Sequence, residues 1–265
     1  MLTLYFSGTG NTEYVAELFS RKMNVKCFSI EEEDVDFTEE IKAHGTIAFC
    51  YPIYNSRVPR IMRIFVHEHM SVLVGKKIVI LVTQQKFSGD GARVFTDLFE
   101  SGAIEILYAE HFNLQQNMGN IPVWSALFRP TEKTNRRYIK KTETKMNIVC
   151  NNIKNGIVKK RGFSKMSEIL GYIQGKPWQR DTSVVAPTRL EKRLSEGVRI
   201  HEDCTACNLC VGICPMKNLQ NHDGKIEHLN NCTLCCRCTN RCPQKAITVY
   251  IHRKPKWQYN GMVQG

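Results

Sequence analysis

Five short runs of branched and aromatic residues recur along the first 110 positions of the chain and predict β-strands. They occupy residues 2–6, 25–30, 46–51, 78–82 and 104–109. The third and fourth runs are apolar throughout, which is typical of strands that are buried on both faces of a sheet. We therefore expect these runs to form the interior of one layered domain.

Helical periodicity separates the predicted strands. Apolar residues recur three or four positions apart at Val15, Leu18 and Phe19, and again within residues 61–65 and 94–99. Strands that alternate with helices predict a parallel sheet with helices on both faces. The predicted fold class is α/β, with a doubly wound parallel sheet of five strands.

The pattern changes after residue 110. Residues 111–130 show no regular period, whereas residues 133–160 predict a basic helix. One side of that helix carries Met146, Val149, Cys150, Ile153 and Ile157. A second short helix is expected around Met166, Ile169, Leu170 and Ile173. Residues 176–197 hold two prolines and mixed charges, and we interpret them as a linker.

Length and hydropathy limit the class of protein. A chain of 265 residues with 42% hydrophobic content can form one sizeable core and a smaller second unit. No window approaches the roughly 18 apolar residues that a membrane span needs, and the first residues lack the pattern of a secretion signal. We expect a cytoplasmic protein without a membrane partner.

The formal charge of +12 is concentrated in one segment, because residues 129–180 contain 14 Lys or Arg against 3 acidic residues. A nucleic-acid-binding function is one interpretation of this segment. It lacks the interleaved aromatic residues and motifs of nucleic-acid-binding proteins. We interpret it instead as a solvated helix face or a dock for an acidic redox partner, and we expect no nucleic-acid partner.

Eight of the twelve cysteines form two runs that repeat with an offset of 28 residues, each with the spacing CxxCxxCxxxCP. In bacterial ferredoxins, three close cysteines of such a run hold one four-iron cluster and the fourth crosses to the other cluster. The predicted ligands of the first cluster are Cys204, Cys207, Cys210 and Cys242. The predicted ligands of the second cluster are Cys232, Cys235, Cys238 and Cys214.

Zinc and disulfides are the alternatives for these cysteines. Structural zinc sites usually pair CxxC motifs from separate segments, and disulfides are unexpected in a chain without a secretion signal. Cys236 falls outside the duplication, since the matching residue is Asn208, and we interpret it as a spare packed thiol rather than a swapped ligand or redox sensor. The remaining cysteines, Cys27, Cys50 and Cys150, are expected in the core.

Residues 4–12, LYFSGTGNT, lead from the first predicted strand into a loop of small residues. A nucleotide-binding Walker loop requires a lysine, and none lies between Ser7 and Thr12, which excludes the usual ATP or GTP site. Gly8 and Gly10 fit a dinucleotide fingerprint, but Glu13 stands where its third glycine belongs. Hydroxyls, an amide and free backbone N–H groups at a helix start can bind a phosphate monoester. The alternative is a glycine-rich turn without a ligand.

This loop resembles the FMN phosphate loop of flavodoxins, and residues 1 to about 110 are similar to the flavodoxin fold. The resemblance implies the strand order 2-1-3-4-5, with FMN at the carboxyl ends of the strands by the first and third. The implied phosphate-loop residues are Ser7, Thr9, Gly10, Asn11 and Thr12.

The resemblance also implies that the loops after the third and fourth strands, residues 51–60 and 83–92, frame the flavin ring. Tyr54 is the candidate to stack on the ring, with Tyr51 and Phe87 behind it. The other candidate contacts in these loops are Pro52, Ile53, Thr83, Gln84, Gly89 and Gly91.

The whole chain resembles proteins of anaerobes that fuse a flavodoxin-like domain to a C-terminal two-cluster ferredoxin, because FSGTGN, YPIY and the duplicated cysteine run all match. The resemblance implies a flavodoxin-like FMN domain at 1–175, the linker at 176–197, a small α+β ferredoxin domain with two 4Fe4S clusters at 198–250, and a tail at 251–265.

Flavin exchanges electrons singly or in pairs, whereas each four-iron cluster exchanges one. We therefore expect an electron-transfer protein that passes electrons between FMN, two clusters and redox partner proteins. The alternative is a flavin-dependent reductase of a small molecule, fed by its own ferredoxin domain, with residues 111–130 as a lid over the flavin. No catalytic residue is recognisable.

Overall fold

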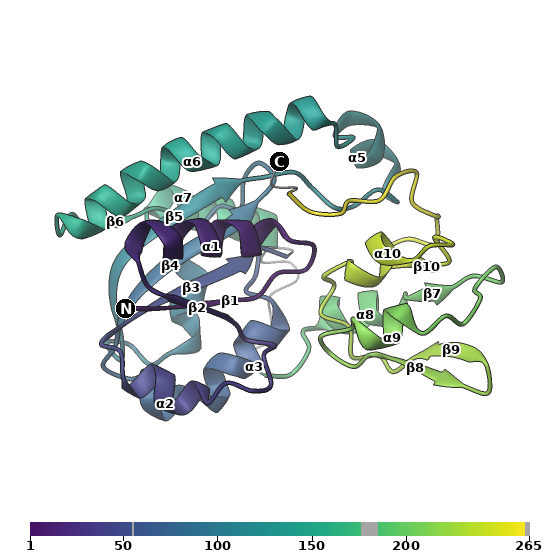
Figure 1. Cartoon of the computed structure of the whole chain (residues 1–265), viewed down its shortest axis with the longest axis horizontal. Coiled ribbons are helices and arrows are strands. Elements are labelled where there is room, and N and C mark those ends of the chain that lie inside the picture. Colours follow the sequence, from purple (N-terminus) through teal and green to yellow (C-terminus); the bar gives the residue numbers. More distant parts are fainter. Residues whose placement is uncertain (55, 176–184, 263–265) are drawn as a thin grey trace.

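A parallel sheet of six strands, ordered β2-β1-β3-β4-β5-β6, forms the largest element of the computed structural model (Figure 1), which describes residues 1–54, 56–175 and 185–262. The strands are β1 (Leu2–Tyr5), β2 (Lys26–Ser29), β3 (Thr46–Pro52), β4 (Lys77–Gln84), β5 (Glu105–Asn113) and β6 (Lys159–Lys160). The predicted α/β class and the order of the first five strands are confirmed. The predicted strand count was too low, because β6 has only two residues, both lysines, and no apolar pattern marks it.

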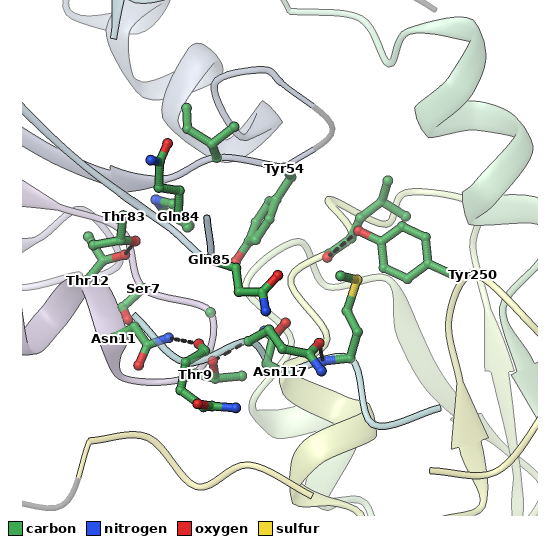
Figure 2. A pocket seen from close by; sticks show the side chains of 17 residues that line it. Ser7, Thr9, Asn11, Thr12, Tyr54, Thr83, Gln84, Gln85, Asn117 and Tyr250 are labelled. Carbon is green, nitrogen blue, oxygen red and sulfur yellow. Dashed lines mark hydrogen bonds between the residues drawn. The ribbon is translucent and has the colours of Figure 1, made fainter. Parts of the chain in front are cut away.

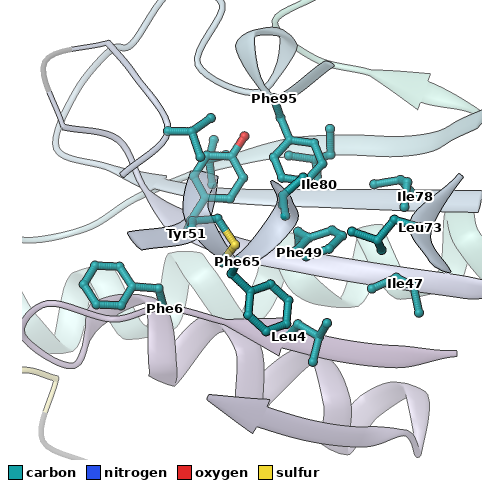
Figure 3. Close-up of a cluster of buried hydrophobic side chains, with 14 of the residues drawn as sticks. Leu4, Phe6, Ile47, Phe49, Tyr51, Phe65, Leu73, Ile78, Ile80 and Phe95 are labelled. Atoms are coloured by element: carbon teal, nitrogen blue, oxygen red, sulfur yellow. The ribbon is translucent and has the colours of Figure 1, made fainter. Parts of the chain in front are cut away.

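Helices cover both faces of the sheet (Figure 1). One face packs against α1 (Asn11–Met23) and α6 (Glu132–Lys154). The other packs against α2 (Phe37–Lys42), α3 (Arg60–Glu68), α4 (Met70–Leu73) and the 3₁₀ helix η1 (Arg93–Leu98). Strand β3 shows the alternation clearly. Ile47, Phe49 and Tyr51 face the second core, on the side of α2 and α3, whereas Ala48 and Cys50 face the first, on the side of α1 and α6. Figure 3 shows the second core with its aromatic residues in contact.

Residues 114–175, which follow β5, contain the helices α5 (Pro122–Leu127), α6 and α7 (Lys165–Gly175). Helix α6 buries Met146, Val149 and Cys150, as the periodicity predicts. It ends at Lys154, so the prediction that Ile157 continues its apolar side was wrong, and this side chain is exposed. Helix α7 is present where it is expected, but its predicted apolar residues are exposed.

The predicted linker 176–197 contains a helix. Its residues 176–184 lie outside the described residues, and α8 spans Arg189–Glu196. The Thr188 hydroxyl accepts a hydrogen bond from the Glu191 amide, and the Glu191 carboxylate accepts one from the Thr188 amide, which caps the helix start. The Glu191 carboxylate also pairs with the buried guanidinium of Arg63 on α3, 2.5 Å away. The second half of this segment is therefore fastened to the α/β layer.

The cysteine-rich region is a small unit of short strands and helices. Its elements are β7 (Arg199–Ile200), α9 (Leu209–Gly212), β8 (Leu219–His222), β9 (Lys225–His228), α10 (Arg237–Arg241) and β10 (Ile247–Thr248). The backbone repeats the 28-residue duplication, because positive φ angles occur at matching positions. The matching pairs are Ala206 and Leu234, Asn208 and Cys236, and Lys217 and Lys245.

Residues 256–262 follow the cysteine region and run back over the α/β layer, as the yellow ribbon in Figure 1 shows. Trp257, Tyr259 and Met262 are buried. The Trp257 indole N–H donates to the Ser125 carbonyl at 2.9 Å, and Met262 packs in the core beside α1 and α6. Residues 256–262 of the predicted tail thus pack against the α/β layer, and we call this segment the strap. No helix in the described ranges has the length and apolar character needed to cross a membrane.

Candidate functional site

A pocket lies at the carboxyl ends of β1, β3 and β4, next to the cysteine-rich region (Figure 2). In a parallel sheet this edge is the usual place for a ligand, because the order of connections reverses between β1 and β3. The predicted residues that line the pocket are Ser7, Thr9, Asn11, Thr12, Pro52, Ile53, Tyr54, Thr83 and Gln84. The other lining residues are Gly8, Gln85, Gln115, Gln116, Asn117, Met118, Leu234 and Tyr250.

The loop between β1 and α1, residues 7–12, forms one end of the pocket. Gly10 adopts a φ of 93° at the helix start, which the absence of a side chain permits. The Ser7 hydroxyl accepts a hydrogen bond from the Gly10 amide at 3.0 Å. Within the described residues, the backbone N–H groups of Thr9, Asn11 and Thr12 donate to no other group. The loop therefore presents free donors at the positive end of α1.

Side chains from two distant segments brace this loop. The Thr12 and Thr83 hydroxyls share a buried hydrogen bond of 2.7 Å, which joins the start of α1 to the end of β4. The Asn11 amide group donates to the Gln115 carbonyl at 2.7 Å. The Asn117 amide group donates to the Thr9 hydroxyl at 3.2 Å and to the Cys235 carbonyl at 3.3 Å. Asn117 thus links the loop to the cysteine-rich region.

Tyr54 projects from the segment after β3 into the pocket (Figure 2). Burial, together with the nearby thiols of Cys235 and Cys236, raises the pKa of its phenol well above the ordinary value. The phenol is therefore neutral at physiological pH and can serve as a flat apolar wall with one hydroxyl donor. Tyr250 lies to the right of Tyr54 in Figure 2, on the side of the pocket away from Ser7 and Thr12. Its hydroxyl donates to the Leu234 carbonyl at 3.3 Å.

Five predicted contacts lie outside the pocket lining: Gly10, Tyr51, Phe87, Gly89 and Gly91. Gly10 shapes the helix start and packs against Gly261 of the strap. The loop after β4 turns away from the pocket, so that Phe87 is 51% exposed and Gly89 packs against Gly171 of α7. The same loop carries Gly91, whose carbonyl accepts a bond from the Tyr51 hydroxyl in the core. Phe87, Gly89, Gly91 and Tyr51 do not line this pocket, and their contact with a flavin ring stays a prediction.

Sequence reasoning gave residues 111–130 as a lid over the flavin in the alternative function, but it named none of residues 115–118, which form a wall of the pocket. These residues follow β5, whose carboxyl end lies at the same edge of the sheet as those of β3 and β4. The polar run QQN, which is separated by five residues from the predicted strand 104–109, was the available signal, although no periodicity marked it. Leu234 and Tyr250 could not be found in this way, because their place depends on how the cysteine-rich region packs.

The eight cysteines of the duplicated runs line two separate cavities. The first cavity is bordered by Cys204, Cys207, Cys210 and Cys242. The second is bordered by Cys214, Cys232, Cys235 and Cys238, with Cys236 beside them. Each cavity therefore brings together three cysteines of one run and the fourth of the other.

Burial and neighbouring thiols govern the protonation of these side chains. Burial, then Cys204, Cys242 and Cys207, raises the pKa of Cys210 to about 11. Burial, then Cys235 and other neighbours including Cys214, raises the pKa of Cys232 to about 12. The thiols of Cys210 and Cys232 therefore stay protonated at neutral pH unless a positive centre compensates the charge of their thiolates.

Backbone amides already point at three of the sulfurs. The donors are the amides of Asn218 to Cys214 at 3.2 Å, Ala246 to Cys242 at 3.2 Å, and Leu234 to Cys232 at 3.3 Å. The first two bonds are related by the 28-residue offset. Among residues 1–54, 56–175 and 185–262, no three His, Cys, Asp or Glu side chains form a group that could hold a metal ion.

The cysteines outside the runs are packed. Cys236 occupies the left-handed position at the start of α10 that Asn208 occupies before α9, and its thiol is 3% exposed. Burial raises its pKa well above the ordinary value. Cys50 and Cys150 are buried in the core beside α1, as predicted, and Cys27 is partly buried against the same core.

Comparison with known proteins identifies the family of the N-terminal region. Residues 2–145, more than half of the chain, match the model of a flavodoxin domain. The chain belongs to the flavodoxin-domain family. This membership supports a flavin, FMN, as the ligand of the pocket. No curated protein matches the chain.

Solved structures similar to the flavodoxin domain include three flavoproteins. A putative flavoprotein from Bacteroides eggerthii is 21% identical and covers 49% of this chain and 98% of its own, with a TM-score of 0.36. A flavodoxin from the domain Archaea is 16% identical, over 58% and 97%, with a TM-score of 0.35. An FMN-dependent NADH-azoreductase from Bacillus anthracis, solved with FMN, is 12% identical, over 56% and 98%, with a TM-score of 0.29.

The flavodoxin domain touches the second cysteine cavity through Gly8. A Cβ atom added at Gly8 would lie 2.8 Å from the Cys235 carbonyl oxygen and closer still to the Tyr54 hydroxyl. Ordinary contacts of a Cβ atom begin at 3.4 Å, so only glycine allows the two loops to approach this closely. The wall of the pocket and the wall of the second cavity are therefore in direct contact.

Arg237, which follows Cys236 in the chain, bridges the contact between the loop after β1 and the cysteine-rich region. Its guanidinium donates to the carbonyls of Ser7 at 2.7 Å and Gly8 at 3.1 Å, and it pairs with Glu31 at 2.6 Å. A further bond goes to the Ile213 carbonyl at 3.0 Å. One side chain thus ties the loop of the flavodoxin domain to both cysteine runs.

Proposed function

We propose that the chain passes electrons between FMN in the flavodoxin-domain pocket and two 4Fe4S clusters in the cysteine cavities, and from there to redox partner proteins. The observation that supports this proposal is the contact between Gly8 and Cys235, because it joins the pocket to the second cysteine cavity. When bound, FMN exchanges electrons singly or in pairs and each cluster exchanges one.

The pocket fits FMN through neutral donors. The free N–H groups of Thr9, Asn11 and Thr12 suit a phosphate dianion at the positive end of α1, and the hydroxyls of Thr9 and Thr12 lie beside them. Tyr54 supplies an aromatic face, and the polar groups of Gln84 and residues 115–117 surround the rest of the lining. No charged side chain lines this pocket within the described residues.

The cysteine cavities fit clusters through their donor sets. In each cavity four thiols face one space, and three of the eight sulfurs already accept a backbone N–H bond. Each iron of a four-iron cluster takes one thiolate, so its four ligands stand farther apart than the ligands of a single ion. The crossed arrangement of three cysteines plus one, which the duplication predicts, is the arrangement we propose.

The proposed order of transfer is FMN, the second cluster, the first cluster and the partner. Cys235 of the second set borders the FMN pocket through Gly8, whereas Cys207 of the first set is exposed. Arg237 and Asn117 hold the junction together, and Leu234 with Tyr250 closes the pocket from the cysteine side. The chain's own residues thus fix the distance between the two proposed cofactor sites.

Anaerobic purification followed by iron, sulfide and flavin analysis tests the cofactor content. We expect about eight irons, eight sulfides and one FMN per chain. Rapid mixing with a limiting amount of dithionite then tests function, because electrons should redistribute between the flavin and cluster absorption bands within one protein molecule. A protein that holds both cofactors but shows no redistribution would contradict the proposal.

A flavin-dependent reductase fed by its ferredoxin domain is the second candidate function. Residues 115–117 favour it, because the polar side chains of Gln115, Gln116 and Asn117 line the pocket and could contact a small substrate. A panel of small-molecule acceptors distinguishes the two. A carrier reduces only protein acceptors such as cytochrome c, whereas a reductase turns over at least one small molecule.

A further inference from the structure

A cationic groove lies between α6 and the β5–β6 edge of the sheet and has a volume of about 620 Å³. Its floor is apolar, with Val149 buried and Ile148 half exposed. Its rim carries six cations, Arg137, Lys140, Lys141, Lys145, Lys159 and Arg161. One acidic residue, Glu110, lies in the lining.

Glu110 forms ion pairs with three of the six cations, and the other three do not pair with it. Its carboxylate is 2% exposed and pairs with Lys159 at 3.0 Å, Arg161 at 3.2 Å and Lys145 at 3.5 Å. Arg137, Lys140 and Lys141 form no ion pair with any described residue. The groove therefore keeps a clear excess of positive charge at its solvent-exposed rim.

The groove leads to the proposed FMN pocket. A neighbouring hollow is lined by Lys141 and Lys145 of the groove and also by Gln85 and Lys86. Gln85 in turn lines the FMN pocket. The groove thus shares lining residues with the neighbouring hollow, and that hollow shares Gln85 with the FMN pocket, so a partner seated on the groove would reach the edge of the flavin site.

We propose that this groove docks the acidic surface of a redox protein that exchanges electrons with the flavin. From Arg137 to Lys145 the cations extend about 12 Å along the helix axis at 1.5 Å per residue, and Lys159 and Arg161 face them from the sheet edge. Charges spread over such a distance match several carboxylates on a protein surface rather than one small anion. Complementary charge increases the rate of encounter, most strongly at low salt.

This inference rests on the proposed function and identifies the entry point for electrons. The partner at the groove delivers its electron on the flavin side, at the opposite end of the relay from the exposed Cys207. The chain would then have two docking surfaces, one for a donor and one for an acceptor. Arg137, Lys140 and Lys141 are not among the residues that line the proposed FMN pocket, so their replacement leaves that lining unchanged.

The test compares the double variant Lys140→Glu/Lys141→Glu with the control Lys192→Glu/Lys225→Glu. Both variants change the net charge equally, and Lys192 and Lys225 are exposed residues outside the groove. The donor is a reduced acidic two-iron ferredoxin, and flavin reduction is followed by stopped flow at 20 mM and 500 mM salt. We expect the groove variant to slow this reaction at least tenfold at low salt only, and the control to change it less than twofold.

Three other outcomes separate the alternatives. Equal rates for the two variants would overturn the docking site. Saturable inhibition by pyrophosphate that disappears in the groove variant, with an unchanged rate of reaction with ferredoxin, would assign the groove to a small anion and overturn the proposal as well. Dithionite should reduce the flavin of all variants alike. If dithionite reduces the flavin but no electron passes from the flavin to the clusters, the proposed function fails. The rates with reduced ferredoxin in the groove and control variants would still test the docking site.

Discussion

Replacing Gly8 with alanine tests the contact on which the proposed relay depends. The added Cβ atom would lie 2.8 Å from the Cys235 carbonyl oxygen. The Cys235 segment must move by at least about 0.6 Å to restore an ordinary contact. Tyr54 can rotate its hydroxyl away, but the backbone of the cysteine loop has no such freedom, because Arg237 and Asn117 hold it.

The magnitude follows from the cost of inserting one methyl group into a packed contact. Overpacking of this kind costs about 1–3 kcal/mol. At about 1.4 kcal/mol per factor of ten, the closed arrangement of the two units is disfavoured by roughly 5- to 150-fold. We therefore expect Gly8→Ala to slow electron redistribution between flavin and clusters, and to lower the free energy of unfolding by the same 1–3 kcal/mol.

Stopped-flow absorbance after reduction with limiting dithionite measures the redistribution, and flavin fluorescence measures FMN binding. Gly45→Ala and Gly212→Ala are the matched controls, because neither added Cβ has an atom within 4 Å. The double variant Gly8→Ala/Tyr54→Phe removes the hydroxyl but leaves the Cys235 carbonyl. The defect should persist in it if the two loops are pushed apart.

Two results would refute this reasoning. One is a Gly8→Ala protein whose redistribution rate and stability equal those of the two glycine controls. The contact between Gly8 and Cys235 would then contribute nothing to electron transfer or stability. The other is full recovery in the double variant, which would assign the defect to Tyr54 alone and remove the argument for a direct contact between the pocket and the second cavity.

Three further predictions concern the two sites and the buried histidine. Thr12→Ala should weaken FMN binding at least tenfold, from a lost charge-assisted hydrogen bond of about 1.5–3 kcal/mol, while riboflavin binding stays unchanged by fluorescence titration; equal weakening would move the phosphate elsewhere. Cys214→Ala should remove the paramagnetic resonance signal of the second cluster and keep most of the first; the reverse loss would contradict the crossed ligands. Burial, together with Arg161 and Lys145, lowers the pKa of His111 from its ordinary 6.5 to about 4. Unfolding then takes up a proton between these values, so stability should fall by up to about 3 kcal/mol as the pH drops from 6.5 to 4. Chemical denaturation of His111→Asn should show a flatter pH dependence in that window, and an unchanged slope would contradict this assignment.

Much of the α/β layer could be predicted from the sequence, because burial on both faces leaves a strong pattern. Strands β3 and β4 read as continuous apolar runs, and the helix period of α1 places Val15 and Phe19 in the core. The order of β1 to β5 followed from the resemblance to flavodoxins. By contrast, β6 consists of two exposed lysines, and its pairing with Tyr108 and Ala109 depends on where α6 ends.

The candidate site was predictable where its residues lie directly after a strand. Residues 7–12 and Thr83 follow β1 or end β4, so the carboxyl edge of the sheet brings them together. Phe87 and Gly89 could not be placed, because the direction of their loop is set by its packing on α7. The wall contributed by Leu234 and Tyr250 depends on contacts more than 200 residues away along the chain, for which a local pattern carries no information.

The strap formed by residues 256–262 has a consequence for the order of assembly. The Tyr259 hydroxyl donates to the Asn11 side chain at 2.6 Å, and Gly261 packs against Thr9 and Gly10. During synthesis these partners emerge from the ribosome about 250 residues apart, after the whole cysteine region. The FMN loop therefore completes its packing only once the cysteine region has been made, so that maturation of the flavin site waits for the part of the chain that we propose to be its electron partner.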